Sequence, residues 1–447
     1  MINVLRYFFT VFVLGYTLLF PNAPVRLSLL SVVFFASVAF IVKDNKKQYP
    51  LAFIVFGFYA LVMGLIYTQG GPDYEMGRAI KTPAVIGMLG VVTWVGLRPL
   101  KEAQFLLYGM AWNMVQFIGI LFNIRGIDTH HLLPFAVTKG IDLQGFQDTS
   151  IADQLETQSR YFGFTAEGSI VAGVSALFAV CAINHVLGKW MKSDRPSSNS
   201  LLVAGLTVAC ACAISVLAKT KAGVAVMLCF GLVAWIGILF SRVSVTKKAT
   251  ASTSVVLTIV ALLLGLIGYA AISHKAADYM QQEAERTAAL LKSGEVSYDG
   301  AGTATRSEYA KLAVLGALHT PWGVGASNGY AYAKPVLKQI DPTPEMQMFF
   351  DQRVYNGYKS VLLNMLGMAG IVGMVCFFLL LNWVRRDVAQ VAGENSYGLG
   401  WGVAAAFLAL SFCADEIPIF PLIAFVGTWC AASREAIEQG LADEQAV

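Results

Sequence analysis

Residues 200–240 read SLLVAGLTVACACAISVLAKTKAGVAVMLCFGLVAWIGILF. The gap Lys219-Thr220-Lys221 divides this stretch into two apolar runs. Each run approaches the length of about 20 residues that crosses a bilayer as a helix. The stretch therefore predicts a transmembrane hairpin whose connecting turn carries two lysines.

The composition of the whole chain agrees with a membrane protein. Of its 447 residues, 56% are hydrophobic and only 13% are charged, whereas soluble domains carry about 25% charged residues. We expect an all-α polytopic membrane protein with about twelve transmembrane helices. The predicted spans are 4–20, 25–42, 51–68, 79–97, 103–123, 166–188, 200–218, 222–240, 253–272, 357–381, 398–413 and 417–433.

Lysine and arginine gather in alternate short loops, which sets the expected orientation because such loops face the cytoplasm. The cation-rich loops lie at 43–47, 98–101, 189–195, 242–248 and 385–386. Both termini are therefore expected in the cytoplasm, and Lys219 and Lys221 on the outer side. Cations at that side need a reason, and an anionic ligand at the outer membrane surface supplies one.

Two long polar segments, 124–165 and 273–356, are then expected outside the membrane. We divide the chain into 1–272 with nine spans, 273–356 as a large outer loop that carries the catalytic region, and 357–447 with three spans and a cytoplasmic tail. Loops as long as 273–356 are usually functional.

Within the large loop, Thr305-Arg306-Ser307-Glu308 fits a capping box, in which Thr305 and Glu308 each accept from the other's backbone N–H. This predicts a helix from Arg306 to about Leu318. A helix N-terminus favours phosphate, and arginine adds a bidentate fork. The alternative is a solvated arginine at a helix end.

The sequence contains no pattern for metal or nucleic acid. All seven cysteines lie in apolar runs, as small buried hydrophobes do. The net charge of +4 is small, and no basic tract alternates with aromatic residues. We expect no metal, no cofactor and no nucleic-acid partner.

Four segments together resemble a known family. They are Leu217–Gly223 (LAKTKAG), Arg306 followed by His319–Gly325 (HTPWGVG), Tyr355-Asn356-Gly-Tyr, and Gly367–Gly373. A fifth, Arg160–Glu167 (RYFGFTAE), is similar to a signature of polymerases. In their order and spacing these segments resemble the O-antigen ligase and O-antigen polymerase superfamily of bacterial inner membranes.

The resemblance implies a GT-C-like bundle with an active site at the periplasmic face. Such an enzyme is an inverting glycosyltransferase that moves a glycan from undecaprenyl diphosphate to a sugar hydroxyl, without metal or nucleotide sugar. Tyr355 stands where ligases carry a histidine, which favours a polymerase acting on lipid-linked repeat units. The alternative is a ligase that transfers the glycan to lipid A–core.

We assign roles by charge and position. The diphosphate would be bound by Arg160, Lys219, Lys221 and Arg306. Glu167 is the candidate general base, and Tyr355 with Asn356 would orient the acceptor sugar. Lys219 could instead snorkel from a helix end, and Glu167 could pair with Arg160 or cap a helix.

The expected partners are the lipid-linked oligosaccharide donor and acceptor, the bilayer and a chain-length regulator. A transporter or flippase of anionic lipid-linked substrates is the alternative from another class. Carriers often show inverted repeats and charges near the bilayer midplane. Neither is visible in this sequence.

Overall fold

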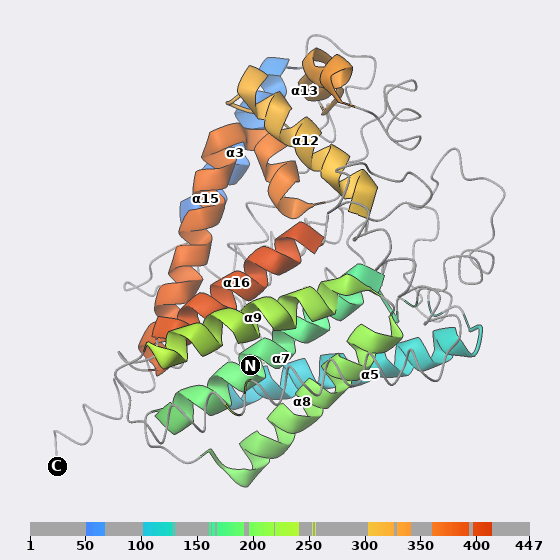
Figure 1. The fold of residues 1–447 in the computed structure, drawn as a ribbon, viewed down its shortest axis with the longest axis vertical. Helices are drawn as coiled ribbons and strands as arrows, with labels where there is room; N and C mark the ends of the chain where they lie inside the picture. Colours follow the sequence, from blue (N-terminus) through green and yellow to red (C-terminus); the bar gives the residue numbers. More distant parts are fainter. Residues whose placement is uncertain are drawn as a thin grey trace, which may run out of the picture.

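The computed structural model describes residues 51–67, 102–127, 129, 161, 163–165, 168–191, 196–218, 220–240, 253, 255, 303–325, 329–340, 360–392 and 397–413. Within these residues all regular elements are helices and none is a strand. The chain forms a bundle of apolar helices and a smaller helical unit at one end (Figure 1).

The bundle helices are α3 (Leu51–Ile66), α5 (Glu102–Ile124), α7 (Gly168–Met191), α8 (Ser198–Leu217), α9 (Lys221–Leu239), α15 (Val361–Ala392) and α16 (Tyr397–Cys413). In the part of the chain described, five of them are long and apolar enough to cross a membrane, and α3 and α16 are shorter apolar helices. All seven overlap predicted spans, and six of them match closely, whereas α15 extends beyond its predicted span to Ala392. The prediction of a helical, multi-pass membrane protein is confirmed at this level, whereas twelve spans and a GT-C fold stay predictions.

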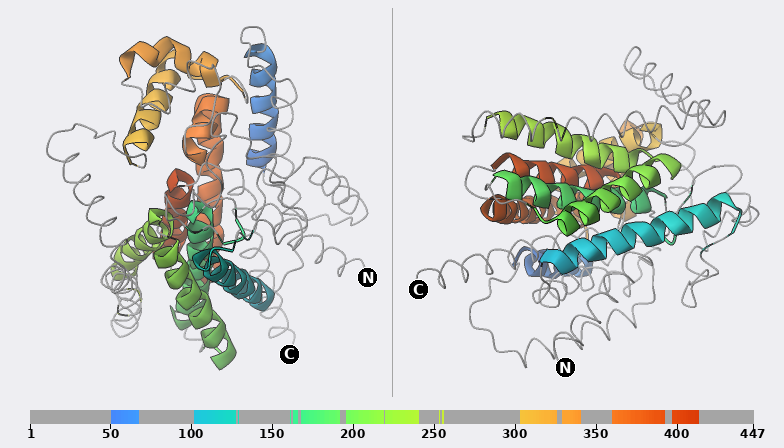
Figure 2. Two further views of the ribbon diagram at one scale, coloured as in Figure 1. Left: turned by 90° about the vertical axis from the view of Figure 1, so that its right-hand side faces the viewer. Right: turned by 90° about the horizontal axis from the view of Figure 1, so that it is seen from below.

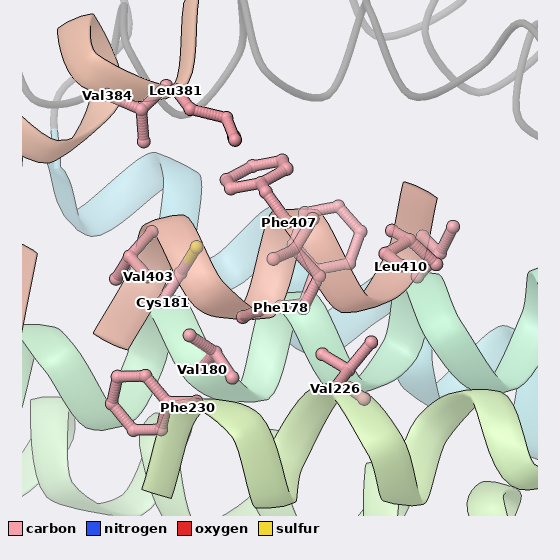
Figure 3. Packing of buried hydrophobic residues seen from close by; sticks show 14 of the residues in the cluster. Phe178, Val180, Cys181, Val226, Phe230, Leu381, Val384, Val403, Phe407 and Leu410 are labelled. Atoms are coloured by element: carbon pink, nitrogen blue, oxygen red, sulfur yellow. The ribbon is translucent and has the colours of Figure 1, made fainter. Parts of the chain in front are cut away.

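Helix α7 is the centre of the bundle. In the most apolar 18 residues of α7, 89% are buried inside the protein, because α7 packs against α5, α8, α9, α15 and α16. Figure 2 shows these helices from two further sides. Figure 3 shows the core, in which Phe178 and Cys181 of α7 lie between Phe230 of α9 and Phe407 of α16.

Helices of the bundle that follow one another directly in the chain run in opposite directions (Figure 1). The first residue of α7, Gly168, lies beside Thr220 at the start of α9. Ser360, just before α15, donates to the carbonyl oxygen of Ser411 near the end of α16 at 2.9 Å. The ends of the helices predicted to share one side therefore lie together. We call this the Gly168 end of the bundle.

At the opposite end, α9 and α16 touch through their backbones. A Cβ added to Gly237 would lie 2.1 Å from the Cα of Gly398, so neither position admits a side chain. Arg385 lies here with its guanidinium carbon 4.7 Å from the ring centroid of Trp401. The predicted loop at Arg385 and Arg386 is wrong, because α15 continues as a helix to Ala392.

The smaller unit consists of α12 (Thr303–His319), α13 (Gly329–Ala333) and the 3₁₀ helix η4 (Lys334–Gln339). It packs on α15 (Figure 1). The unit has its own apolar core, which includes Leu312, Tyr332, Val336 and Leu363. The hydroxyl of the fully buried Tyr332 donates to the carbonyl oxygen of Ala313 at 2.6 Å.

Candidate functional site

The predicted lysine turn is a tight helix-to-helix connection. Helix α8 ends at Leu217, and Thr220 caps α9 by accepting from the backbone N–H of Ala222 at 3.1 Å. Because Thr220 is extended and capping, Lys221 becomes the first residue of α9.

A second candidate segment meets this turn at Gly168. A Cβ added to Gly168 would lie 2.8 Å from the carbonyl oxygen of Tyr161 and 3.3 Å from that of Ala218. It would also lie 3.6 Å from the side chain of Thr220. The backbone next to Arg160 and Glu167 therefore approaches the backbone next to Lys219 and Lys221. The convergence of the four side chains themselves stays a prediction.

Two helix starts and one helix end meet at the lysine turn. Helices α7 and α9 begin side by side at the Gly168 end. Each helix N-terminus carries roughly +0.5 of an elementary charge. Helix α8 ends at the same turn, and its C-terminus carries the opposite partial charge. Attraction of an anion to this end would therefore have to come from the two lysines of the turn.

The turn before α7 is bonded to α5 by buried side chains. Gln116 accepts from the backbone N–H of Phe164 at 2.9 Å, and Asn123 accepts from that of Gly163 at 2.8 Å. Asn123 also donates to Thr129, whose hydroxyl donates to the carbonyl oxygen of Gly163. We call Gln116, Asn123 and Thr129 the amide clamp.

The sequence analysis missed the amide clamp. A signal was present, since Gln116 and Asn123 are polar residues inside an apolar span, seven positions apart and thus on one side of a helix. Polar residues within a span usually have a function or a partner. Their partners could not be inferred, because they lie 40 or more positions along the chain.

Arg306 lies in the first turn of α12, as predicted, but the predicted cap is wrong. The helix begins at Thr303, so Thr305 is already inside it. Glu308 does not reach back to Thr305. Its carboxylate is buried and accepts from Lys311 at 2.5 Å, one helical turn further on. The ion pair with Lys311 takes the carboxylate away from the helix start.

The glycine-rich segment after α12 docks into a break in α15. Helix α15 is kinked at Gly370, where φ is 54°. Residues 320–325, which we call the docking segment, cross this kink. The backbone N–H groups of Val324 and Gly325 donate to the carbonyl oxygens of Gly367 and Met368 at 3.0 and 2.8 Å.

Helix α3 holds the same docking segment from another side. Tyr59 donates to the carbonyl oxygen of Trp322 at 3.0 Å. A Cβ added to Gly325 would lie 2.2 Å from the Cα of Gly64. Two glycine-containing segments that carry the family resemblance, 319–325 and 367–373, thus bind each other, and His319 is an exposed residue at the end of α12.

The remaining candidates cannot be placed in the same way. Five of them, Arg160, Glu167, Lys219, Tyr355 and Asn356, lie outside the described residues. Helix α9 packs on α7, α8 and α16, and α12 packs on α15, α13 and η4. The convergence of Lys221 with Arg306 stays a prediction. Comparison of the chain with protein-family models and with curated proteins found no match.

Proposed function

We propose that this protein is a metal-independent, inverting glycosyltransferase of the O-antigen polymerase type. It acts at the periplasmic face of the bacterial inner membrane. Its donor is a glycan on undecaprenyl diphosphate, and its acceptor is a sugar hydroxyl of another lipid-linked repeat unit. A chain-length regulator is the proposed protein partner.

One observation supports this proposal more than any other. Gly168 lies against the backbone of Tyr161 and Ala218 and the side chain of Thr220, so the described neighbours of Arg160, Glu167, Lys219 and Lys221 approach one another at one end of the bundle. A diphosphate bears several negative charges, and a mixed set of lysine and arginine suits it. Arginine binds phosphate through a planar fork, and lysine acts as a compact charge.

The proposed chemistry needs little from the protein beyond charge and position. The acceptor oxygen attacks the anomeric carbon from the face opposite the leaving group. The bond between that carbon and the phosphate oxygen breaks, and the electron pair leaves with the lipid diphosphate. Glu167 takes the hydroxyl proton. The four cations stabilise the charge that develops on the diphosphate.

A transporter would use the broken helix α15 differently. In carriers, the unwound backbone of a discontinuous helix coordinates substrate or ions. Here the carbonyl oxygens of Gly367 and Met368 already accept from Val324 and Gly325. The break therefore serves as the attachment of the α12 unit, which favours the enzyme over a carrier. A ligase remains the alternative enzyme.

Reconstitution with a single pure substrate tests the proposal. Purified protein in nanodiscs is mixed with one lipid-linked repeat unit in buffer that contains EDTA. A polymerase yields a ladder of products and free undecaprenyl diphosphate. Transfer that occurs only after lipid A–core is added identifies a ligase. Movement of the lipid-linked unit across sealed vesicles without any product contradicts both enzymes.

A further inference from the structure

Helix α5 carries buried amides on one side and exposed apolar residues on another. Asn113, Gln116 and Asn123 are all buried. In contrast, Val115, Ile118 and Leu121 are 48%, 45% and 42% exposed. A buried amide in an apolar helix destabilises the fold unless hydrogen bonds compensate its desolvation, so each amide is expected to have a definite task.

Gln116 and Asn123 hold one particular turn. Their side-chain oxygens accept the consecutive N–H groups of Gly163 and Phe164, and Thr129 donates to the carbonyl oxygen of Gly163. The backbone of two adjacent residues is thus bonded by three side chains. This fixes the turn in position and in rotation about its own axis.

The conformation of Gly163 fits the clamp. Its φ is +59°, a region that residues with a Cβ rarely adopt. A Cβ added here would lie 2.6 Å from the side-chain oxygen of Gln116. Gly119 of α5 permits an equally close approach, since a Cβ on it would lie 2.7 Å from the ring of Phe164.

The turn leads directly into the candidate site. Arg160 precedes Gly163 by three residues, Glu167 follows it by four, and Gly168 then meets Ala218 and Thr220. A shift of the turn would move both Arg160 and Glu167 relative to the lysines of α9. A misplacement of about 1 Å can lower a rate by on the order of 10²-fold.

We propose that Gln116, Asn123 and Thr129 are positioning residues, which set Arg160 and Glu167 against the lysine turn without touching substrate themselves. This inference rests on the proposed function. It goes beyond the proposed function because it assigns a role in catalytic geometry to two residues of α5 and to Thr129 just after it, none of which is a proposed site residue.

Asn113 offers a matched control on the same helix. It is equally buried, but its amide donates to the carbonyl oxygens of Ser175 and Thr207 at 3.2 and 2.9 Å. These bonds join α5 to α7 and α8 in the bundle and do not involve the turn. Asn113→Leu therefore removes two buried hydrogen bonds from the fold and leaves the clamp intact.

Two substitutions of Gln116 separate its acceptor from its bulk. Gln116→Met keeps the length of the side chain and removes the acceptor for Phe164. Gln116→Glu keeps an acceptor oxygen, and burial holds its carboxyl in the neutral form. The amide nitrogen of Gln116 has no partner in the described part of the chain, so its loss breaks no bond found there.

The experiment compares wild type, Gln116→Met, Gln116→Glu and Asn113→Leu in nanodiscs. Hydrogen exchange of peptides that cover 161–165, thermal unfolding, and kcat and KM for ladder formation are measured together. Gln116→Met should raise exchange at 161–165 and lower kcat by about 10-fold or more, given the sensitivity of rates to misplacement. Gln116→Glu should restore most of kcat. Asn113→Leu should lower the melting temperature while exchange at 161–165 and kcat stay near wild type.

Three results overturn the positioning role while leaving the proposed function intact. The first is unchanged hydrogen exchange at 161–165 in Gln116→Met, and the second is raised exchange in that variant with the kcat of wild type. The third is a loss of kcat in Asn113→Leu as large as in Gln116→Met when the two variants are equally stable. Two results together overturn the proposed function and the positioning role with it. Wild type forms no ladder, and Lys221→Ala binds undecaprenyl diphosphate as well as wild type does.

Discussion

The backbone N–H of Ile371 donates to the carbonyl oxygen of Pro321 at 2.9 Å. In an uninterrupted α-helix it would donate to Gly367, four residues earlier. Gly367 accepts instead from Val324. Helix α15 has thus exchanged internal hydrogen bonds for bonds to the docking segment, and the α12 unit is fastened to the bundle through the main chain.

This fastening predicts a strong effect of Gly370→Ala. A Cβ at Gly370 would lie 2.0 Å from the carbonyl oxygen of Pro321, in addition to the strain of φ +54°. Gly126→Ala is the matched control, because Gly126 has φ +77° and nothing within 4 Å of its Cβ position. Strain alone costs about 1–3 kcal/mol, so Gly370→Ala should lower the melting temperature well beyond Gly126→Ala. Equal shifts in thermal unfolding would contradict the fastening.

Loss of the proposed diphosphate cations should stop polymer formation. Lys221→Ala and Arg306→Ala are each expected to lower turnover by about 10²-fold or more, as the loss of one group that stabilises developing charge does. The measurement is the polymer ladder in cells and with purified protein at matched protein levels. Lys338→Ala, an exposed lysine at the end of η4, is the control and should behave as wild type. Normal ladders from both site variants would remove the support for the site.

The proposed base predicts a change in the pH dependence of turnover. Glu167→Gln should lower kcat by about 10²–10⁴-fold, the usual contribution of a general base. It should also abolish the fall in rate towards acidic pH that protonation of the carboxylate causes in wild type. Glu308→Gln is the comparison, since this buried carboxylate pairs with Lys311. It should lower stability and keep the acidic limb of the profile. If Glu167→Gln keeps the same pH dependence of turnover as wild type, Glu167 is not the base and has only a structural role.

The α12 unit should lose stability at alkaline pH through Tyr332. Burial raises the pKa of the Tyr332 hydroxyl above its ordinary value, so the folded protein retains a proton that the unfolded chain releases above about pH 10. Stability is therefore complete below that pH and falls as pH rises further. Tyr332→Phe should lower stability by about 0.5–1.5 kcal/mol at neutral pH through the lost hydrogen bond to Ala313. The further loss of stability above about pH 10 should be smaller in Tyr332→Phe than in wild type. Thermal unfolding at a series of pH values will measure this difference.

The bundle could be predicted from the sequence because its cause is local. Long apolar runs interrupted by short polar gaps define α8 and α9 almost to the residue, and Thr220 is a good helix cap in any context. These features depend on the length of apolar runs and on neighbouring residues, and both can be read directly from the sequence. The orientation that the alternation of cations indicates stays a prediction.

Two features of the structure differ from the prediction, because a neighbouring residue offered a competing contact or because the partner lies far away in the sequence. The pattern Thr305–Glu308 met the rule for a capping box, but Lys311 binds the carboxylate more closely. The kink at Gly370 depends on Pro321 and Val324, almost 50 positions earlier. Contacts of this kind follow from packing of distant segments, which one sequence does not encode in any local pattern.

Helix α9 is fixed at both of its ends by contacts that exclude a side chain. A Cβ on Gly223 would lie 2.1 Å from the hydroxyl oxygen of Ser215, and Gly237 rests on Gly398. These two contacts fix the path of the α9 backbone, and with it the position of the first residue of the helix, Lys221. In the proposed enzyme, accommodation of different glycans would therefore have to come from other parts of the molecule.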